Sequence, residues 1–327
     1  MIPVFDFFNS VATGASEPSR SDYQAESSGI FVVSIGGSLI VDEQGPMVEA
    51  IRAFADAISS LHSSGKKIVV VVGGGKTARN YANAAASLGA NNFEQDLLGI
   101  HVTRANAMLL ANAIAESYNE VVSDVSRVSE LLEAGKVPVF GGLMPFFTTD
   151  SVGALLAEKL NATFVNLTNV DGIYDSDPKT NPDARRFDEI GYNKLVSLIV
   201  AAGSRPGQNV VLDIACCMIL RRSRIPAAVL DGDNIENFKA FVNGYSFTGT
   251  MIKETNGEDE AIAPVAAAEF GAPENSAPAS PEHSVEEADI EGVAKDKKPI
   301  NRGKKRKVRT YVGNLDKKSI HPDEIDF

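Results

Sequence analysis

Short runs of apolar, mostly β-branched residues alternate with longer amphipathic stretches through the middle of the chain. The apolar runs are Ile30–Ile35, Lys67–Val72, Val137–Phe140, Thr163–Leu167 and Ala227–Leu230. The amphipathic stretches, each long enough for several helical turns, include Met47–Ser64, Thr77–Ala90, Thr103–Tyr118 and Ser151–Leu160. Strands that are covered by helices on both faces have this pattern. It predicts an α/β fold, a three-layer α/β/α sandwich with a mainly parallel central sheet.

The composition changes at both ends of this region, so we predict one folded domain over residues 30–252. Residues 1–29 are rich in Ser, Gly and Ala and lack periodicity, which predicts a flexible N-terminal arm. Residues 253–327 are first acidic and rich in Ala and Pro, and then carry the basic run Lys304–Arg309. Such a segment buries too little apolar surface to offset its chain entropy, and we predict a disordered tail.

The formal net charge of the chain is -12, which disfavours nucleic acid and anionic membranes as partners, except at the basic run of the tail. Cys216 and Cys217 are adjacent in an apolar run, so we expect small buried side chains in a reducing compartment rather than a disulfide framework. The sequence shows neither a secretory signal pattern nor an apolar run of about 18 residues, the length of a membrane span. We therefore expect a cytoplasmic protein.

Glycine-rich turns follow the first two apolar runs. The first is Ile35-Gly-Gly-Ser38, and the second is Gly73-Gly-Gly-Lys76 at the start of the helix that carries Arg79. Glycine lets backbone N–H groups approach phosphate oxygens, and a helix N-terminus favours an anion. Either turn alone could serve tight packing only, but successive turns of a parallel sheet share the edge where ligands bind. The spacing matches neither a P-loop nor a dinucleotide fingerprint. We predict a different kind of phosphate site.

Several further motifs follow these turns in order. They are Asp96-Leu-Leu-Gly-Ile, Thr103-Arg-Ala-Asn-Ala-Met, Phe146-Phe-Thr-Thr-Asp150 and Thr168-Asn-Val-Asp-Gly-Ile-Tyr174-x-x-Asp177-Pro178. Together with the glycine turns, the series resembles the uridylate kinases of the amino acid kinase fold, most closely their archaeal form, from Ile30 to Ile252. The resemblance implies ATP-dependent phosphorylation of UMP to UDP in pyrimidine nucleotide biosynthesis. It also implies ATP and Mg²⁺ as cofactors and a homohexamer as the assembly.

The resemblance assigns one group of residues to the acceptor, UMP. Asp96 matches the acid that accepts hydrogen bonds from the ribose hydroxyls, and Gly74 matches a contact of the UMP phosphate. The segment that would surround the uracil comprises Leu143, Met144, Pro145, Phe146, Phe147, Thr148 and Thr149. By residue type alone, Asp96 is also compatible with a solvated loop carboxylate, and the two phenylalanines with core packing.

A second group is implied on the donor side and in catalysis. The implied ATP contacts are Gly37, Ser38, Gly75, Arg79, Thr168, Asn169, Tyr174 and Asp177. The implied catalytic residues are Arg79, Lys76, Asp150 and Asp213. The two cations would neutralise phosphate charge, and Asp150 would organise the cations or Mg²⁺, without a dedicated protein metal site. Arg79 is also compatible with a surface ion pair, and both aspartates with helix N-caps.

The sequence departs from the family pattern at two places. Many members have a lysine two residues before the first glycine pair, where this chain has Ser34, and the turn 203–209 with Arg205 is unusual. The first departure keeps open a second interpretation, a nucleotide-binding member of the fold without turnover or with another specialisation. A third interpretation is an adaptor whose basic tail binds nucleic acid or a transport receptor.

Overall fold

The computed structural model describes residues 29–203 and 211–255 of the 327-residue chain. The N-terminal arm up to Ser28, the turn that carries Arg205 and the tail from Asn256 onward lie outside the described residues. No helix among the described residues is long and apolar enough to cross a membrane.

The centre of the fold is a seven-stranded sheet in the order β3-β2-β1-β4-β6-β7-β5. The strands are β1 Ile30–Ile35, β2 Lys67–Val72, β3 Val139–Phe140, β4 Thr163–Thr168, β5 Glu189–Ile190, β6 Ala227–Asp231 and β7 Thr250–Ile252. Neighbouring strands are parallel, except that β6 and β7 run antiparallel. The central strands are buried on both faces, which explains why their sequences are almost uninterrupted apolar runs.

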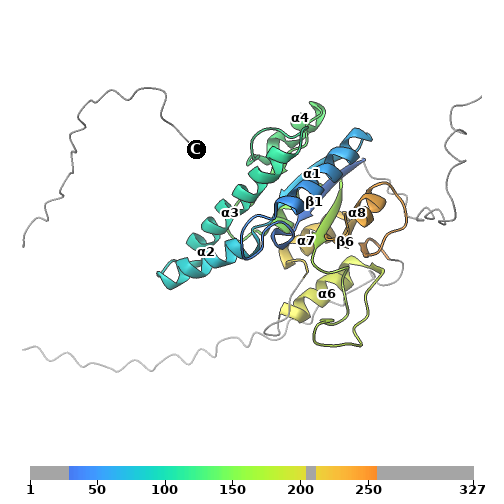
Figure 1. The fold of residues 1–327 in the computed structure, drawn as a ribbon. Coiled ribbons are helices and arrows are strands. Elements are labelled where there is room, and N and C mark those ends of the chain that lie inside the picture. The colour runs from blue at the N-terminus through green and yellow to red at the C-terminus, as the bar shows by residue number, and fades with distance from the viewer. Residues whose placement is uncertain (1–28, 204–210, 256–327) are drawn as a thin grey trace, which may run out of the picture. The chain divides into compact units, whose positions relative to one another are not determined.

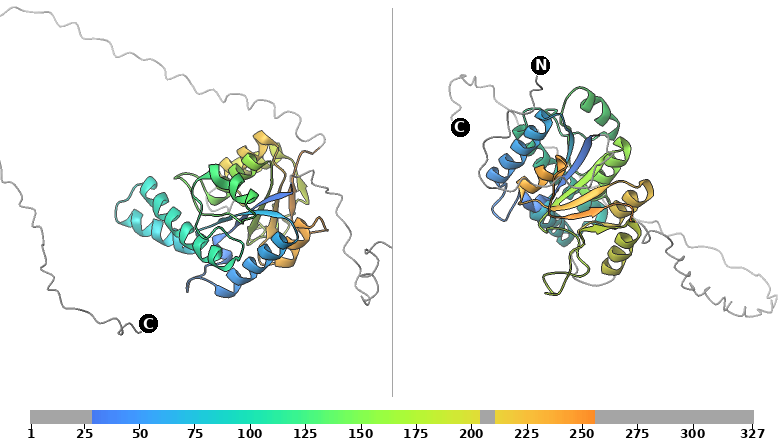
Figure 2. Two further views of the ribbon diagram at one scale, coloured as in Figure 1. Left: turned by 90° about the horizontal axis from the view of Figure 1, so that it is seen from above. Right: turned by 90° about the vertical axis from the view of Figure 1, so that its right-hand side faces the viewer.

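Helices cover both faces of the sheet. They are α1 Val48–Ser63, α2 Gly75–Ser87, α3 Asn92–Ala113, α4 Val128–Glu133, α5 Thr149–Leu160, α6 Tyr192–Gly203, α7 Ile214–Ser223 and α8 Ile235–Val242, with 3-10 turns η2 Gly37–Leu39 and η3 Val125–Arg127. Alternate residues of one strand supply the two cores. Val33 packs with side chains of α1, α3 and α8, and Val32 packs with those of α4 to α7. The predicted three-layer sandwich is confirmed (Figure 2).

Two predicted elements have different bounds in the structure. The helix predicted at Thr103–Tyr118 is α3, which begins at Asn92, because Asn91 and Glu94 form a reciprocal capping box with hydrogen bonds of 3.0 Å. The strand predicted at Val137–Phe140 shrinks to β3, because Pro138 has no N–H for the ladder and contributes only its carbonyl to Val70. The short strand β5 was not predicted.

Helices α2 and α3 lie side by side and project beyond the sheet (Figure 1). Helix α2 begins where β2 ends, so this end of the hairpin lies at the carboxyl edge of the parallel strands. Asn106 of α3 is buried and donates a hydrogen bond of 2.9 Å to the Gly73 carbonyl, which ties the hairpin to the turn after β2. The fold thereby brings the second glycine turn, the hairpin and the strand ends together.

Two helical glycines with opposite surroundings provide a test of the packing. A Cβ atom on Gly153 would lie 2.4 Å from the fully buried ring of Phe164, whereas a Cβ on Gly99 would meet no atom within 4 Å. We expect Gly153→Ala to lower the free energy of unfolding by about 1–3 kcal/mol through overpacking. Gly99→Ala, the matched control, is expected to raise it by up to about 1 kcal/mol through helix propensity. Urea denaturation measures both, and equal effects would contradict this view of the α5–β4 contact.

Candidate active site

The turns after β1 and β2 touch each other through their backbones. A Cβ atom on Gly37 would lie 2.0 Å from the Gly75 nitrogen, and one on Gly74 would lie 2.4 Å from the Cβ of Ala78. Gly75 has a φ of +60°, which glycine adopts without strain. Only glycine fits these positions. The first turn of α2 therefore presents bare backbone beside the turn that follows β1, as a phosphate site requires.

Two cavities meet at this contact. The larger, of about 1010 Å³, extends from the glycine turns over the ends of β1 and β4 to α6. The smaller, of about 370 Å³, lies between α2, α3 and the segment 142–149. The residues that line both are Gly74, Gly75, Arg79 and Thr149. The arrangement suits two anionic ligands whose charged ends meet beside Arg79, and Arg79 forms no ion pair with any residue that the structure describes.

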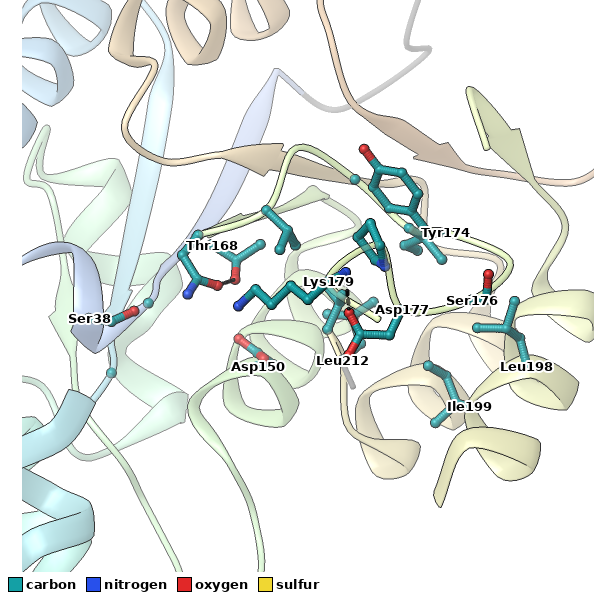
Figure 3. Close-up of a pocket in the computed structure, with 18 of the residues that line it drawn as sticks. Ser38, Asp150, Thr168, Tyr174, Ser176, Asp177, Lys179, Leu198, Ile199 and Leu212 are labelled. Carbon is teal, nitrogen blue, oxygen red and sulfur yellow. Dashed lines mark hydrogen bonds between the residues drawn. The ribbon is translucent and has the colours of Figure 1, made fainter. Parts of the chain in front are cut away.

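The larger cavity collects every residue that was predicted to contact ATP. Gly37, Ser38, Gly75, Arg79, Thr168, Asn169, Tyr174 and Asp177 all line it, as Figure 3 shows in part. The hydroxyl of Tyr174 donates to Asp171 at 2.8 Å, and Asp171 also accepts from Arg186 at 2.8 Å. The bond to Asp171 raises the pKa of Tyr174 and holds its ring at the cavity wall. Fixed in this way, the ring offers a flat apolar surface to a ligand.

Prediction missed two cations of this cavity, Lys179 and Lys194. The side chain of Lys179 extends across the cavity toward Thr168 and Asp150 (Figure 3). Lys194 of α6 lies over the Phe187 ring, 4.9 Å from its centroid. The position of Lys179 directly after the Asp177-Pro178 pair was the only signal that could have singled it out.

An aspartate without a cationic partner lies at the base of the larger cavity. Asp150, in the first turn of α5, accepts a hydrogen bond of 2.7 Å from the hydroxyl of Ser34 on β1. Burial raises the pKa of the Asp150 carboxyl to about 6, the Ser34 bond opposes this shift, and the negative charge of Asp213 adds to it. The hydrogen-bond partner of Asp150 on β1 is thus a neutral hydroxyl and not a cation.

Asp213 is the N-cap residue of helix α7. Its carboxylate caps the N-terminus of α7 by accepting from the Cys216 N–H at 3.0 Å, and it also accepts hydrogen bonds from the hydroxyls of Ser151 and Thr148. It lines neither cavity. Asp150 does not cap its helix, because Thr148 caps α5. Of the two aspartates, only Asp150 faces the proposed ligand space.

The carboxylate of Asp150 is compatible with a bound Mg²⁺. Among residues 29–203 and 211–255, no group of three or more acidic, histidine or cysteine side chains could hold a metal by itself. Mg²⁺ is usually held by one or two carboxylates together with substrate phosphates and water. Asp150 beside a phosphate-sized glycine turn fits such a shared site, and does not fit a metal site made of protein groups alone.

The smaller cavity gathers most of the residues predicted to bind UMP. Gly74, Asp96, Met144, Phe146, Phe147, Thr148 and Thr149 line it, together with the unpredicted Gln95, Ile100 and Thr103. Asp96 belongs to helix α3 rather than to a loop, and its Oδ2 accepts the Phe146 N–H at 2.8 Å. Thr103 accepts the Gly142 N–H at 2.6 Å, so α3 holds the segment 142–149 at both ends of the cavity.

Besides Asp213, three other predicted residues are not brought to the cavities. Leu143 lines neither cavity and packs instead against the core beneath α5 to α7, because neighbouring residues of the segment point in opposite directions. Pro145 also lies outside both cavities. Lys76 is exposed on the surface of α2, and its ammonium group forms an ion pair with Glu43 in the loop after η2. The backbone of the second glycine turn lines the cavities, whereas the side chain of Lys76, which follows the turn, lies outside them.

The fold and the paired cavities agree with the comparison to known proteins. The model of the amino acid kinase family matches residues 29–231, and the chain belongs to this family.

Within the family, the similarity is to archaeal uridylate kinases. The chain is 40% identical over 225 residues to the uridylate kinase of Thermococcus sibiricus, which covers 68% of this chain and 99% of that protein. The uridylate kinase of Archaeoglobus fulgidus is 40% identical over 222 residues, or 68% and 98% of the two chains. The crystal structure of uridylate kinase from Archaeoglobus fulgidus superimposes with a TM-score of 0.60 at 42% identity, covering 68% and 99% of the two chains. The UMP kinase structure from Bacillus anthracis, at 23% identity and a TM-score of 0.59, shares the fold.

The raised pKa of Asp150 predicts a pH-dependent cost in stability. Its carboxyl titrates at about 6 in the folded chain against 3.8 ordinarily, so the folded state binds more protons in that window. The free energy of unfolding therefore falls as pH rises from 3.8 to about 6, and this contribution is constant above. We expect Asp150→Asn to be more stable than the parent at pH 8, by at most about 3 kcal/mol, with the difference vanishing toward pH 4.

Urea denaturation of both proteins across this pH range makes the comparison. Asp56→Asn, on the exposed surface of α1, is the control for removal of one acidic charge. A difference between Asp150→Asn and the parent that does not change with pH would contradict the prediction.

Proposed function

We propose that this chain transfers the γ-phosphoryl group of ATP to UMP and forms UDP, within pyrimidine nucleotide biosynthesis. The observation that carries the proposal is the pair of cavities that share Arg79 and the glycine backbone of α2. Phosphoryl transfer asks an enzyme mainly to hold two polyanions in line and to neutralise their charge. The similarity to uridylate kinases supports UMP as the acceptor.

In the proposed complex ATP occupies the larger cavity. Its adenosine lies beside Tyr174, Thr168 and Asp177, and its phosphates lie along Gly37, Ser38 and Gly75. Asp150 would hold Mg²⁺ together with the phosphates, and the ion supplies charge neutralisation of the donor. Lys179 adds a positive charge at the end of β4, where the cavity also contains the carboxylates of Asp175 and Asp177.

UMP occupies the smaller cavity. Its phosphate lies at the N-terminus of α2, at Gly74, where unpaired N–H groups and the helix dipole favour an anion. Its ribose hydroxyls donate to Asp96 of α3, and its base lies against the segment Met144–Thr149. Arg79 then faces both phosphates, and its planar fork stabilises the charge that develops between them.

A coupled assay of ATP-dependent UDP formation by the purified chain tests the proposal. UMP should be preferred over CMP by roughly 100-fold, because a site built to hydrogen-bond one base edge leaves polar groups unpaired with the other. Equal rates with CMP would remove the uracil assignment. Binding of ATP and UMP without turnover would support the non-catalytic interpretation instead.

The assembly implied by the family resemblance is also a proposal. Leu97, Leu98, Met108 and Leu109 of α3 are exposed, with between 36% and 54% of their surface accessible. A long helix with this many exposed apolar residues supports a self-complementary surface in a homohexamer. A molar mass of one subunit from light scattering at micromolar concentration would contradict it.

Replacement of Arg79 provides the sharpest test of the shared position. We expect Arg79→Ala to lower the turnover number by roughly 10²- to 10³-fold, as is typical when one transition-state donor is removed. Its melting temperature should change little, because the side chain is exposed and lacks an ion pair among the described residues. Arg52→Ala on α1, which removes an exposed arginine paired with Glu49 at 3.0 Å, is the control and should keep full turnover. Equal turnover of the two variants would show that Arg79 has only a surface role.

A further inference from the structure

Phe146 has a backbone conformation that its side chain disfavours. Its φ is +75°, in the left-handed region. The other residues with side chains and positive φ in the described part of the chain are Asn161 and Arg224, which end α5 and α7 as left-handed C-caps. Phe146 ends no helix. Its conformation therefore lacks the structural reason that the other two have.

The ring of Phe146 also gains little from the fold. It is 79% exposed, whereas the neighbouring Phe147 is partly buried and packs against the core beneath α5 to α7. The two rings meet edge to face with centroids 6.1 Å apart. A strained backbone and an exposed large aromatic ring occur at the same residue, and that residue lines the smaller cavity. Such combinations persist where a ligand uses them.

The backbone of Phe146 is held by the residue proposed to bind ribose. Its N–H donates to Oδ2 of Asp96 at 2.8 Å, and an ionised carboxylate has room for further donors. A ribose that donates its hydroxyls to Asp96 thus carries its base to the neighbourhood of Phe146. The aromatic ring and the ribose site are coupled through one carboxylate.

We propose that Phe146 is a specificity-determining residue whose ring stacks on the pyrimidine base. The acceptor site then selects phosphate esters that carry a planar base over sugar phosphates that lack one. The proposal rests on the proposed function and adds to it the physical basis of base selection. By sequence, either phenylalanine could stack on the base or fill the core. Both line the smaller cavity, but Phe147 also packs against the core, so Phe146 has the ring that is free to stack.

Binding measured by calorimetry without ATP tests this proposal, with UMP and ribose 5-phosphate as the two probes. We expect Phe146→Gly and Phe146→Asn, both of which tolerate a positive φ, to weaken UMP binding by roughly 5- to 100-fold, the range for loss of one base–aromatic stack. Their affinity for ribose 5-phosphate should stay within about twofold of the parent, because that ligand has no base to stack. Phe146→Tyr should restore most of the UMP affinity.

Asn161→Gly is the matched control, because it places glycine at a left-handed position away from both cavities. It should bind both probes as the parent does. Unchanged UMP affinity in Phe146→Gly and Phe146→Asn would overturn the proposal. An equal loss for UMP and ribose 5-phosphate would also overturn it, since the residue would then act through Asp96 and not through the base. If the parent protein itself does not bind UMP, the proposed function is contradicted. This result is distinct from the two outcomes for the Phe146 variants.

Discussion

The backbone contact between the turns after β1 and β2 determines the geometry of everything around it. In the parallel pairing of β1 with β2, Ile35 is opposite Val72, so the two strands end level and their turns meet. A Cβ atom on Gly37 would lie 2.0 Å from the Gly75 nitrogen, a clash that would force the strands' ends apart. Because the turns can touch, α2 starts at the sheet edge, and the cavities on its two sides share its first residues. The proposed in-line transfer depends on this shared boundary.

The electrostatics of the site follow from a neutral group on β1. Ser34 is fully buried and satisfies Asp150 with a hydroxyl, which leaves the carboxylate without a compensating charge. A partly buried carboxylate in that state disfavours its own ionisation. Positive charge is located instead on the ligand side of the cavity, on Arg79 and Lys179. The stability that ionisation of Asp150 costs the folded chain is lost between pH 3.8 and about 6, and a cation held beside the carboxylate in the proposed complex would offset it.

Local patterns in the sequence predict what depends on the backbone. The five strand runs and the glycine turns are found in the sheet and at its edge, and the eight ATP contacts that the family resemblance implied all line the larger cavity there. Strand ends and glycine turns place the chain regardless of side-chain direction. Lys76, Leu143 and Asp213 were predicted to belong to the site, but the structure places them outside both cavities, because each prediction depends on where one side chain points. The start of α3 was readable from the Asn91 and Glu94 capping box. The position of the Lys179 side chain could not be predicted from the sequence, since only the folded loop directs it across the cavity.

The two adjacent phenylalanines show that one backbone angle can give identical side chains different environments. With an ordinary φ at Phe146, successive side chains would alternate between core and solvent, and either ring could take the buried place. The left-handed φ of +75° turns the chain between them, so that Phe147 packs on the core and Phe146 stays at the cavity. Asp96 stabilises this turn by accepting the Phe146 N–H. In the proposed complex, one acid on α3 would hold both the sugar and the backbone of Phe146, which is why the proposed acceptor site depends on the hairpin rather than on the sheet.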